Sequence, residues 1–228
     1  MRVRRTFAFV DLSGFTALTE SEGDERAVRV LTVFRATLRE ICSRRAVRIA
    51  KWLGDGAMLV SVDSKPLVAA ALEMMFAADT APEPITVKCG ITRGQVILLE
   101  GDDYIGHAVN VAARLCDLAR GHEVLALAEL VSELPAWGTA QSNDEITVRG
   151  LEQPLRVVRL DVHHPGPDAI PDPICHIPLT VEIAFEHRRD VNGATLLFCS
   201  DSCLETWLER PPHVVREEPG AVREVWMR

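Results

Sequence analysis

Two aspartates stand at positions where the sequence predicts the ends of β-strands. Asp11 closes the apolar run 6–12 (TFAFVDL), and Asp55 lies between Gly54 and Gly56 at the tip of a tight hairpin. Glycines on both sides of an aspartate allow the positive φ angles that such a turn requires. Hard cations such as Mg²⁺ take few protein carboxylates and complete their shell with water and phosphate oxygens. Each aspartate alone is typical of an ordinary turn or strand end, whereas the two together predict a site for two divalent cations that hold a triphosphate.

A glycine turn and the start of a helix follow the first of these strands. Ser13, Gly14, Phe15 and Thr16 come directly after it, and Ser13 is a good N-cap for the helix that begins next. The first backbone N–H groups of a helix have no partner within the helix, so they can bind an anion. This turn is therefore a candidate phosphate-binding element beside the two aspartates.

A third group of polar residues lies in the segment 101–120 (GDDYIGHAVNVAARLCDLAR). From His107 onward the apolar residues recur at helical spacing, and Asn110 and Arg114, four residues apart, share one face of that helix. An arginine presents a fixed positive fork to a phosphoryl-transfer transition state, and an asparagine can orient a ribose or an attacking hydroxyl. The plainer interpretation is a solvated polar stripe, and this helix alone does not separate the two.

The elements that must position these residues follow from the hydrophobic pattern. Strands are expected on both sides of the 54–56 turn and at 6–12, 85–91, 95–99, 123–126, 146–149 and 155–160, and helices at 17–45, at 66–78 and from 107 onward. The residues 92–94 (TRG) are expected to form a second hairpin turn. The order β-α-β-β-α-β-β-α-β predicts an α+β domain in which helices cover one face of an antiparallel sheet.

Four segments, taken in order and spacing, resemble the class III adenylate/guanylate cyclase catalytic domain. They are FVDLSGFTALTE, KWLGDGAMLVS, DDYIGHAVNVAAR and VRGLEQPLRVVRL, and the likeness covers residues 4–160. The resemblance implies a ferredoxin-like nucleotidyl cyclase core over 1–160. It also implies that Asp11 and Asp55 are ligands of two Mg²⁺ or Mn²⁺ ions in each active site.

The resemblance implies roles for the other polar residues as well. Asn110 would act on the ribose and Arg114 on the pentavalent phosphorus, while Lys51 and Asp103 match the pair that recognises adenine. The turn after the first strand would contact the substrate. In this family the site lies at the interface of a head-to-tail homodimer. One subunit supplies the two metal-binding aspartates. The other supplies the lysine, the asparagine, the arginine and the aspartate that recognises adenine, so a monomer would be inactive.

One departure from the family pattern concerns the triphosphate. Active members often carry a lysine in a KGKG turn near the end of the domain. The corresponding turn here is VRGLEQ, with Arg149 in the first basic position and Leu151 in the second. Three interpretations stay open: Arg149 substitutes for the lysine, triphosphate binding is weak, or the domain binds nucleotide with little turnover.

The composition argues against several classes of partner. The chain of 228 residues is 47% hydrophobic and carries a formal net charge of −8, whereas proteins that bind nucleic acid or anionic lipid are basic. No apolar run approaches the roughly 20 residues of a membrane-spanning helix. The apolar run after the initial MRVRR ends at Asp11, too early for a signal peptide. We therefore expect a cytoplasmic protein that binds neither nucleic acid nor a membrane.

The composition changes after residue 160. The segment 161–171 (DVHHPGPDAIP) is rich in proline and without periodicity, so it is expected to be a linker. A Cys-rich module at 172–215 follows, and then a tail at 216–228. Within the module, Asn192 and Gly193 predict a hairpin turn, and Ser200 is expected to cap a short helix.

The cysteines of this module predict a metal site. Cys199 and Cys203 lie four residues apart across the helix start, and Cys175 precedes them. The positive end of the helix favours their thiolates, and Zn²⁺ is the candidate ion. His187 is the candidate fourth ligand, with His176 as a second choice. The alternative is a small module with packed free cysteines and no ion.

The module resembles the YHS/TRASH family of small metal-binding modules. DPIC at its start and FCSDSC followed by an apolar helix and RPP match that family's DPVC…FCS-x-x-C…P pattern. The usual Gly-Met after the first cysteine is His176-Ile177 here. The resemblance implies that this β-hairpin and helix module binds a metal ion.

These observations together predict an adenylate cyclase that converts ATP to 3′,5′-cyclic AMP and pyrophosphate as a homodimer. The C-terminal module is then a metal- or redox-responsive regulator or a docking surface for a protein partner. Two alternatives stay open. One is a nucleotide-binding sensor with weak catalysis, and the other is a metal-binding protein that uses the cyclase fold as a dimerising scaffold.

Overall fold

The computed structural model describes residues 1–81, 85–99, 103–148, 153–184 and 187–209, without the side chains of 142 and 143. The helices are α1 (Phe15–Glu22), α2 (Asp24–Arg44), α3 (Ser64–Thr80), α4 (His107–Leu118), α5 (Asp201–Glu209) and the 3-10 helix η2 (Ala128–Glu133). The strands are β1 (Arg2–Leu12), β2 (Arg48–Leu53), β3 (Gly56–Ser61), β4 (Val87–Leu98), β5 (Tyr104–Ile105), β6 (Glu123–Leu127), β7 (Gly138–Ile146), β8 (Leu155–Val162), β9 (Ile170–Pro171), β10 (Pro178–Leu179), β11 (Arg188–Val191) and β12 (Ala194–Leu197).

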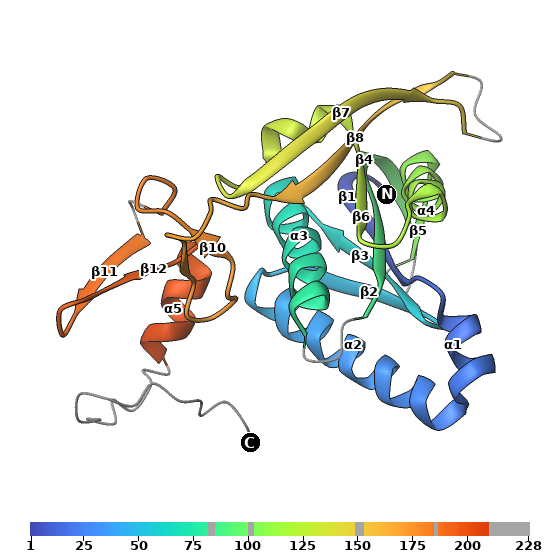
Figure 1. Cartoon of the computed structure of the whole chain (residues 1–228). Helices are drawn as coiled ribbons and strands as arrows, with labels where there is room; N and C mark the ends of the chain where they lie inside the picture. Colours follow the sequence, from blue (N-terminus) through green and yellow to red (C-terminus); the bar gives the residue numbers. More distant parts are fainter. Residues whose placement is uncertain (82–84, 100–102, 149–152, 185–186, 210–228) are drawn as a thin grey trace.

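A mixed sheet organises the larger part of the molecule (Figure 1). Its strands follow the order β2-β3-β1-β4-β6-β8-β7, and β5 pairs with β4. All neighbours are antiparallel except β4 and β6, which are parallel because α4 crosses over between them. The α+β architecture expected from the element order is confirmed.

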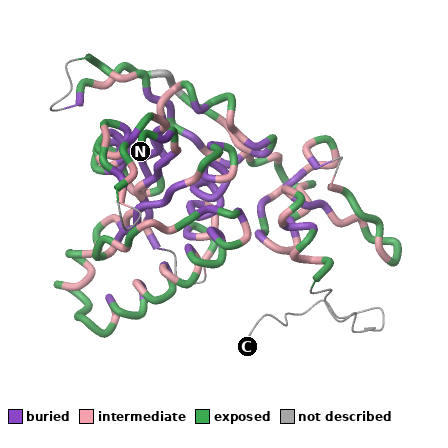
Figure 2. The backbone as a smooth tube through the Cα atoms, turned by 180° about the vertical axis from the view of Figure 1, so that it is seen from behind, coloured by how far each residue is buried: buried purple, intermediate pink, exposed green. Residues whose placement is uncertain are grey.

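Strand β1 lies in the middle of this sheet and is covered on both sides. Its side chains alternate: Ala8 and Val10 belong to the core that α2 and α3 cover. Phe7 belongs to a second cluster, together with Ala108 and Ala112 of α4. Figure 2 shows the resulting buried centre between exposed outer helix faces. Helices were expected on one face of the sheet only. In the structure α2 and α3 cover one face and α4 covers the opposite face.

Strand β4 differs from the two short strands and hairpin turn expected at 85–99. It runs without interruption because β1 pairs with it residue by residue, from Arg2 opposite Ile97 to Leu12 opposite Val87. Gly94, expected in a turn, has a packing role instead. A Cβ at this position would lie 2.8 Å from the Cβ of Ala108, so glycine allows α4 to approach the strand.

Two further boundaries differ from expectation. Gly23, with φ of 82°, separates α1 from α2 within the segment 17–45, which was expected to be helical. Strand β7 occupies residues before the expected strand at 146–149 and ends at Ile146.

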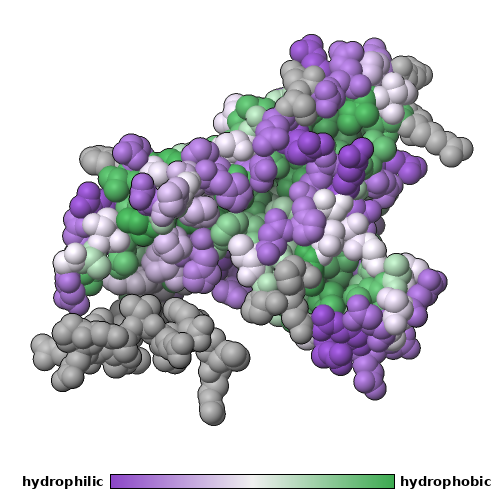
Figure 3. All heavy atoms as spheres, in the orientation of Figure 1, coloured by the Kyte–Doolittle hydropathy of each residue, from purple (hydrophilic) through white to green (hydrophobic). Residues whose placement is uncertain are grey.

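The C-terminal module lies beside α3, away from α1 (Figure 1). The expected hairpin is confirmed: β11 and β12 are joined by Asn192 and Gly193, with φ of 50° and 81°. Helix α5 begins directly after Ser200, whose Oγ accepts a hydrogen bond from the Cys203 N–H at 3.4 Å. In the part of the chain described, no helix has the length and apolar character needed to span a membrane. Hydrophilic side chains dominate the face of the molecule shown in Figure 3.

Candidate active site and thiol cluster

Asp11 and Asp55 lie on neighbouring strands of the sheet. Asp11 in β1 is paired with Gly56, the first residue of β3, and Asp55 immediately precedes this glycine in the turn after β2. Gly54 has φ of 64°, the positive value expected in this turn. A Cβ at Gly56 would lie 2.8 Å from Asp11 Oδ1, so glycine is needed for β3 to approach this carboxylate. The register thus places the two aspartates next to each other.

The charges around Asp11 oppose one another. Burial and the negative charge of Asp55 raise the pKa of the Asp11 carboxyl, while Lys88 lowers it. Lys88 Nζ lies 3.3 Å from Asp11 Oδ2. A divalent cation between the aspartates would relieve their repulsion, and a set of carboxylate oxygens fits Mg²⁺ or Mn²⁺. Lys88 was not expected at this site, because its place opposite Asp11 depends on the register of β4 with β1.

The turn after β1 places a helix N-terminus beside this strand end. The N-cap of α1 is Gly14, with φ of 78° and ψ of 15°. The expectation of Ser13 as N-cap was wrong by one residue, because glycine adopts the left-handed conformation of this cap more readily. Ser13 instead donates its N–H to the Thr86 carbonyl at 2.8 Å. Phe15 and Thr16 are the first residues of α1, where backbone N–H groups are available to an anion.

Lys51 and Asp103 form an ion pair. Lys51 Nζ donates to Asp103 Oδ1 at 2.7 Å across 52 residues of sequence. Asp103 also accepts the Tyr104 N–H at 2.8 Å. These two hydrogen bonds lower the pKa of its carboxyl. The side chains stay 45% and 43% exposed, so a ligand can reach both. A lysine donor beside a carboxylate acceptor complements a base edge that offers an acceptor beside an amine.

Asn110 and Arg114 both lie on the exposed side of α4. The other side of the helix packs closely on β4: a Cβ at Gly90 would lie 2.2 Å from the Cys116 backbone nitrogen. Arg114 Nη1 lies 3.5 Å from Asp117 Oδ2, with side chains 58% and 66% exposed. Such an exposed pair is weak, so the guanidinium can engage another partner. Arg149 and Leu151 lie outside the described residues.

The three cysteines of the module come together as expected. Cys199 Sγ lies 3.4 Å from Cys175 Sγ and 3.5 Å from Cys203 Sγ. These sulfur atoms and a carboxylate oxygen of Asp172 all lie within 4.8 Å of one another. Zinc–sulfur bonds of about 2.3 Å in a tetrahedral site separate two sulfurs by about 3.8 Å, so the donor set fits Zn²⁺.

The fourth group of this cluster is Asp172 rather than the expected His187. Asp172 is fully buried. Its Oδ1 accepts the N–H of Ile174 at 2.7 Å and of Cys175 at 3.2 Å, and its Oδ2 accepts the N–H of Cys199 at 2.7 Å. His187 Nε2 lies instead 3.0 Å from Asp201 Oδ1, outside the cluster. Asp172 was expected only as part of the DPIC segment that matches the family pattern, and not as a ligand.

The environment of the cluster favours one thiolate in particular. Hydrogen bonds with Cys175 and Cys203, together with the positive charge of Arg45, lower the pKa of the Cys199 thiol. Burial raises the pKa of Cys175 and of Asp172. These surroundings therefore favour the thiolate form of Cys199, whose sulfur lies within 3.5 Å of both other sulfurs.

A cavity of about 790 Å³ lies between the module and the α2–α3 end of the sheet domain. Its lining includes Arg45 and Lys65 from the domain, and Cys199 and Glu182 from the module. Asp11, Asp55 and Lys51 are not part of it. The cavity thus opens onto the thiol cluster and not onto the paired aspartates.

The comparisons with known proteins agree with this architecture. Residues 4–160 match the model of the family described as the adenylate and guanylate cyclase catalytic domain. An uncharacterized protein of Mycobacterium tuberculosis (strain ATCC 25618 / H37Rv) is 34% identical over 161 residues, which make up 71% of this chain and 41% of that protein. The chain thus spans about two fifths of the length of this curated relative.

Two solved structures have a similar fold. The adenylyl cyclase CyaB from P. aeruginosa superimposes with a TM-score of 0.60 at 24% identity, covering 72% of this chain and 97% of that chain. The guanylyl cyclase Cya2 superimposes with a TM-score of 0.62 at 21% identity, covering 72% of this chain and 95% of that chain. From the family match over most of its length, we conclude that the chain belongs to the adenylate and guanylate cyclase catalytic domain family.

Proposed function

We propose that the domain 1–160 is an adenylate cyclase that converts ATP to 3′,5′-cyclic AMP and pyrophosphate. The observation that carries the choice of ATP is the 2.7 Å ion pair between Lys51 and Asp103. The lysine would donate to adenine N1 and the aspartate would accept the exocyclic amine. Guanine presents a donor and a carbonyl at the corresponding positions, so the same pair would disfavour GTP. Because ATP is made inside the cell, the proposal places the domain in the cytoplasm.

The catalytic groups would act from three parts of the fold. Asp11 and Asp55 would hold two Mg²⁺ or Mn²⁺ ions, which activate the ribose 3′-hydroxyl and stabilise the leaving pyrophosphate. The N–H groups at the start of α1 would bind phosphate oxygens. Asn110 would orient the ribose, and Arg114 would place positive charge on the reacting phosphorus.

The exposure of these groups supports a site completed by a second subunit. Asn110 and Arg114 lie on the open side of α4, and Lys51 and Asp103 are also accessible. In a head-to-tail homodimer, the aspartates of one subunit would face these four residues of its partner. A C2-symmetric dimer would then contain two such composite sites.

The first test is cyclic nucleotide production by the purified chain, with ATP or GTP and with Mg²⁺ or Mn²⁺. We expect cyclic AMP from ATP, lost in Asp11→Asn and kept in Asp168→Asn, the same change at an exposed aspartate. No product from either nucleotide, at concentrations where the chain is dimeric, would favour the nucleotide-binding sensor.

Mixing two inactive variants tests the composite site. Asp11→Asn removes a group from one half of each site and Asn110→Ala from the other half. Random assembly makes half of the dimers mixed, each with one intact site, so about a quarter of the wild-type activity should return. A mixture as inactive as its components would contradict the head-to-tail arrangement.

We also propose a metal-binding role for the C-terminal module, with Zn²⁺ as the candidate ion and Asp172, Cys175, Cys199 and Cys203 as the donors. The convergence of three thiols and a buried carboxylate supports it. The module would regulate the cyclase or bind a protein partner. If the cyclase fold serves only as a scaffold, the chain should bind one ion tightly and its cyclase rate should not depend on that ion.

A further inference from the structure

The C-terminal end of α2 carries a buried group of charges. The side chains of Arg44, Arg45 and Glu73 are 7%, 5% and 2% exposed. Glu73 on α3 is ion-paired with both arginines, and Arg45 Nε lies 2.7 Å from its Oε2. Glu40 reaches Arg44 at 3.4 Å, but it is 74% exposed and contributes little. Two buried cations therefore share one buried anion, which leaves an excess positive charge that is costly without a further negative partner.

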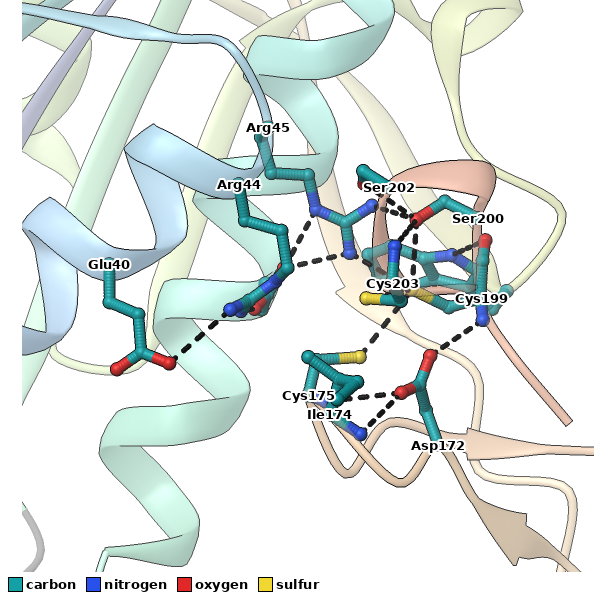
Figure 4. Close-up of polar contacts among 12 residues, drawn as sticks. Glu40, Arg44, Arg45, Asp172, Ile174, Cys175, Cys199, Ser200, Ser202 and Cys203 are labelled. Carbon is teal, nitrogen blue, oxygen red and sulfur yellow. Dashed lines mark hydrogen bonds and ion pairs between the residues drawn. The ribbon is translucent and has the colours of Figure 1, made fainter. Parts of the chain in front are cut away.

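The excess charge faces the thiol cluster (Figure 4). Arg45 Nη2 donates to Cys199 Sγ at 3.0 Å, and Nη1 donates to Ser200 Oγ at 3.0 Å. Trp137 reinforces this contact, because its Nε1 donates to the Cys199 carbonyl at 3.3 Å while its ring lies 5.5 Å from the Arg45 guanidinium carbon. The contact thus joins residues from the cyclase domain to the module across more than 150 residues of sequence.

The charge of an occupied cluster would complement this arrangement. Three thiolates and one carboxylate carry four negative charges, so a divalent ion leaves the complex with a charge of −2. Groups hydrogen-bonded to metal ligands orient them and tune the affinity of the site. The cavity beside Cys199 gives an ion an approach to the sulfurs from the domain boundary.

We propose that Arg45 is the ionic partner of the metal-loaded cluster, so that metal binding holds the C-terminal module against the α2–α3 end of the cyclase domain. This inference rests on the proposed metal site of the module and is independent of cyclase activity. Arg45 is a positioning residue: it contacts a metal ligand and not the metal. A bound metal ion fixes the three sulfurs relative to one another, so without it the sulfur that Arg45 contacts is less firmly positioned and the module is held less firmly.

Zinc affinity provides the first test. The full-length chain is freed of metal, and Zn²⁺ binding is measured against a competing chelator. We expect one ion per chain, and we expect Arg45→Gln to lower the affinity by about 10- to 100-fold. Arg45→Lys keeps the positive charge but not the forked guanidinium, so its zinc affinity should lie between those of the wild type and Arg45→Gln. Arg29→Gln, the matched control at an exposed position of α2, should bind as the wild type does.

Glu73→Gln should act in the opposite direction. Without the Glu73 charge, the positive charge of both buried arginines is compensated only by the cluster, so zinc should bind more tightly. The melting temperature of the zinc-free chain should fall. A purely structural role for the charge group would weaken zinc binding in both variants. Equal affinities in wild type, Arg45→Gln and Glu73→Gln, or a wild type that binds no zinc, would overturn the proposal.

Docking itself can be followed without nucleotide. Trp137 contacts both Arg45 and Cys199, so its fluorescence, taken as the difference between each protein and its Trp137→Phe variant, should change on zinc binding in the wild type and much less in Arg45→Gln. Zinc should also protect the segment 163–169 between β8 and β9 from a broad-specificity protease in the wild type but not in Arg45→Gln. Equal protection in the two proteins would contradict the role of Arg45. An inactive cyclase would leave these readouts unchanged, so the two proposals can fail separately.

Discussion

Gly56→Ala is the substitution that most directly tests the geometry of the paired aspartates. The added Cβ would lie 2.8 Å from Asp11 Oδ1 and 2.8 Å from the Val10 carbonyl oxygen. Relaxed C···O contacts begin near 3.3 Å, so each overlap is about 0.5 Å. The carbonyl belongs to the backbone of β1 and cannot rotate away. The chain must therefore open the pairing of β1 with β3 or turn the Asp11 carboxylate.

The expected cost follows from the size of this overlap. Forcing an extra methyl into a packed position costs about 1–3 kcal/mol, which would appear as a lower midpoint of urea unfolding. A displacement approaching 1 Å at a catalytic group can reduce the rate by about 10²-fold. We therefore expect weaker Mn²⁺ binding and a loss of cyclase activity larger than the loss of stability explains.

Gly54→Ala is the matched control in the same turn. A Cβ at Gly54 meets nothing within 4 Å, but φ of 64° strains any other residue by about 1–2 kcal/mol. The two variants should thus lose similar stability, while only Gly56→Ala loses affinity for Mn²⁺. Equal metal affinity in Gly56→Ala and the wild type, measured by Mn²⁺ titration, would refute the argument.

Three further predictions concern single side chains. Lys51→Glu removes a charge-assisted hydrogen bond and should lower kcat/KM for ATP by about 10- to 100-fold relative to GTP; unchanged selectivity would contradict the adenine-reading role. Asp172→Asn replaces an acceptor-only group by one that cannot satisfy all three N–H donors, so urea unfolding with a chelator present should show a loss of about 1–3 kcal/mol. The pKa of Asp11 is raised above its ordinary value of 3.8 by burial and by Asp55, so protons compete with metal there to a higher pH than at an ordinary aspartate. Mn²⁺ affinity should rise with pH through this raised pKa and then level off, whereas Asp11→Asn should lose that dependence.

The sequence predicted the fold through local patterns that survive in the structure. The apolar run at 6–12, the glycine turn at 54–56 and the helical spacing from His107 all correspond to observed elements. The Asn192-Gly193 hairpin and the helix after Ser200 do so as well. Each of these signals is set by neighbours in sequence, which is why one chain is enough to recognise it.

The errors came where distant parts of the chain determine the outcome. Gly94 was expected in a turn, but glycine is required at this position because α4 approaches the strand closely. The opposition of Lys88 to Asp11 depends on the register between β1 and β4. Asp172, and not the expected His187, joins the three cysteines because of the way the loops of the module fold around them. Periodicity and spacing carry no information about such contacts.

Helix α2 contacts both functional regions of the molecule. Arg35 from its middle donates to the Gly54 carbonyl at 2.7 Å, next to Asp55, while Arg45 at its C-cap contacts Cys199. The 21 residues of the helix span about 30 Å as one stiff rod. If occupancy of the thiol cluster changes nucleotide affinity through this helix, thermodynamic linkage requires nucleotide to change zinc affinity by the same factor. The cell's ATP level would then influence how firmly the module retains its metal.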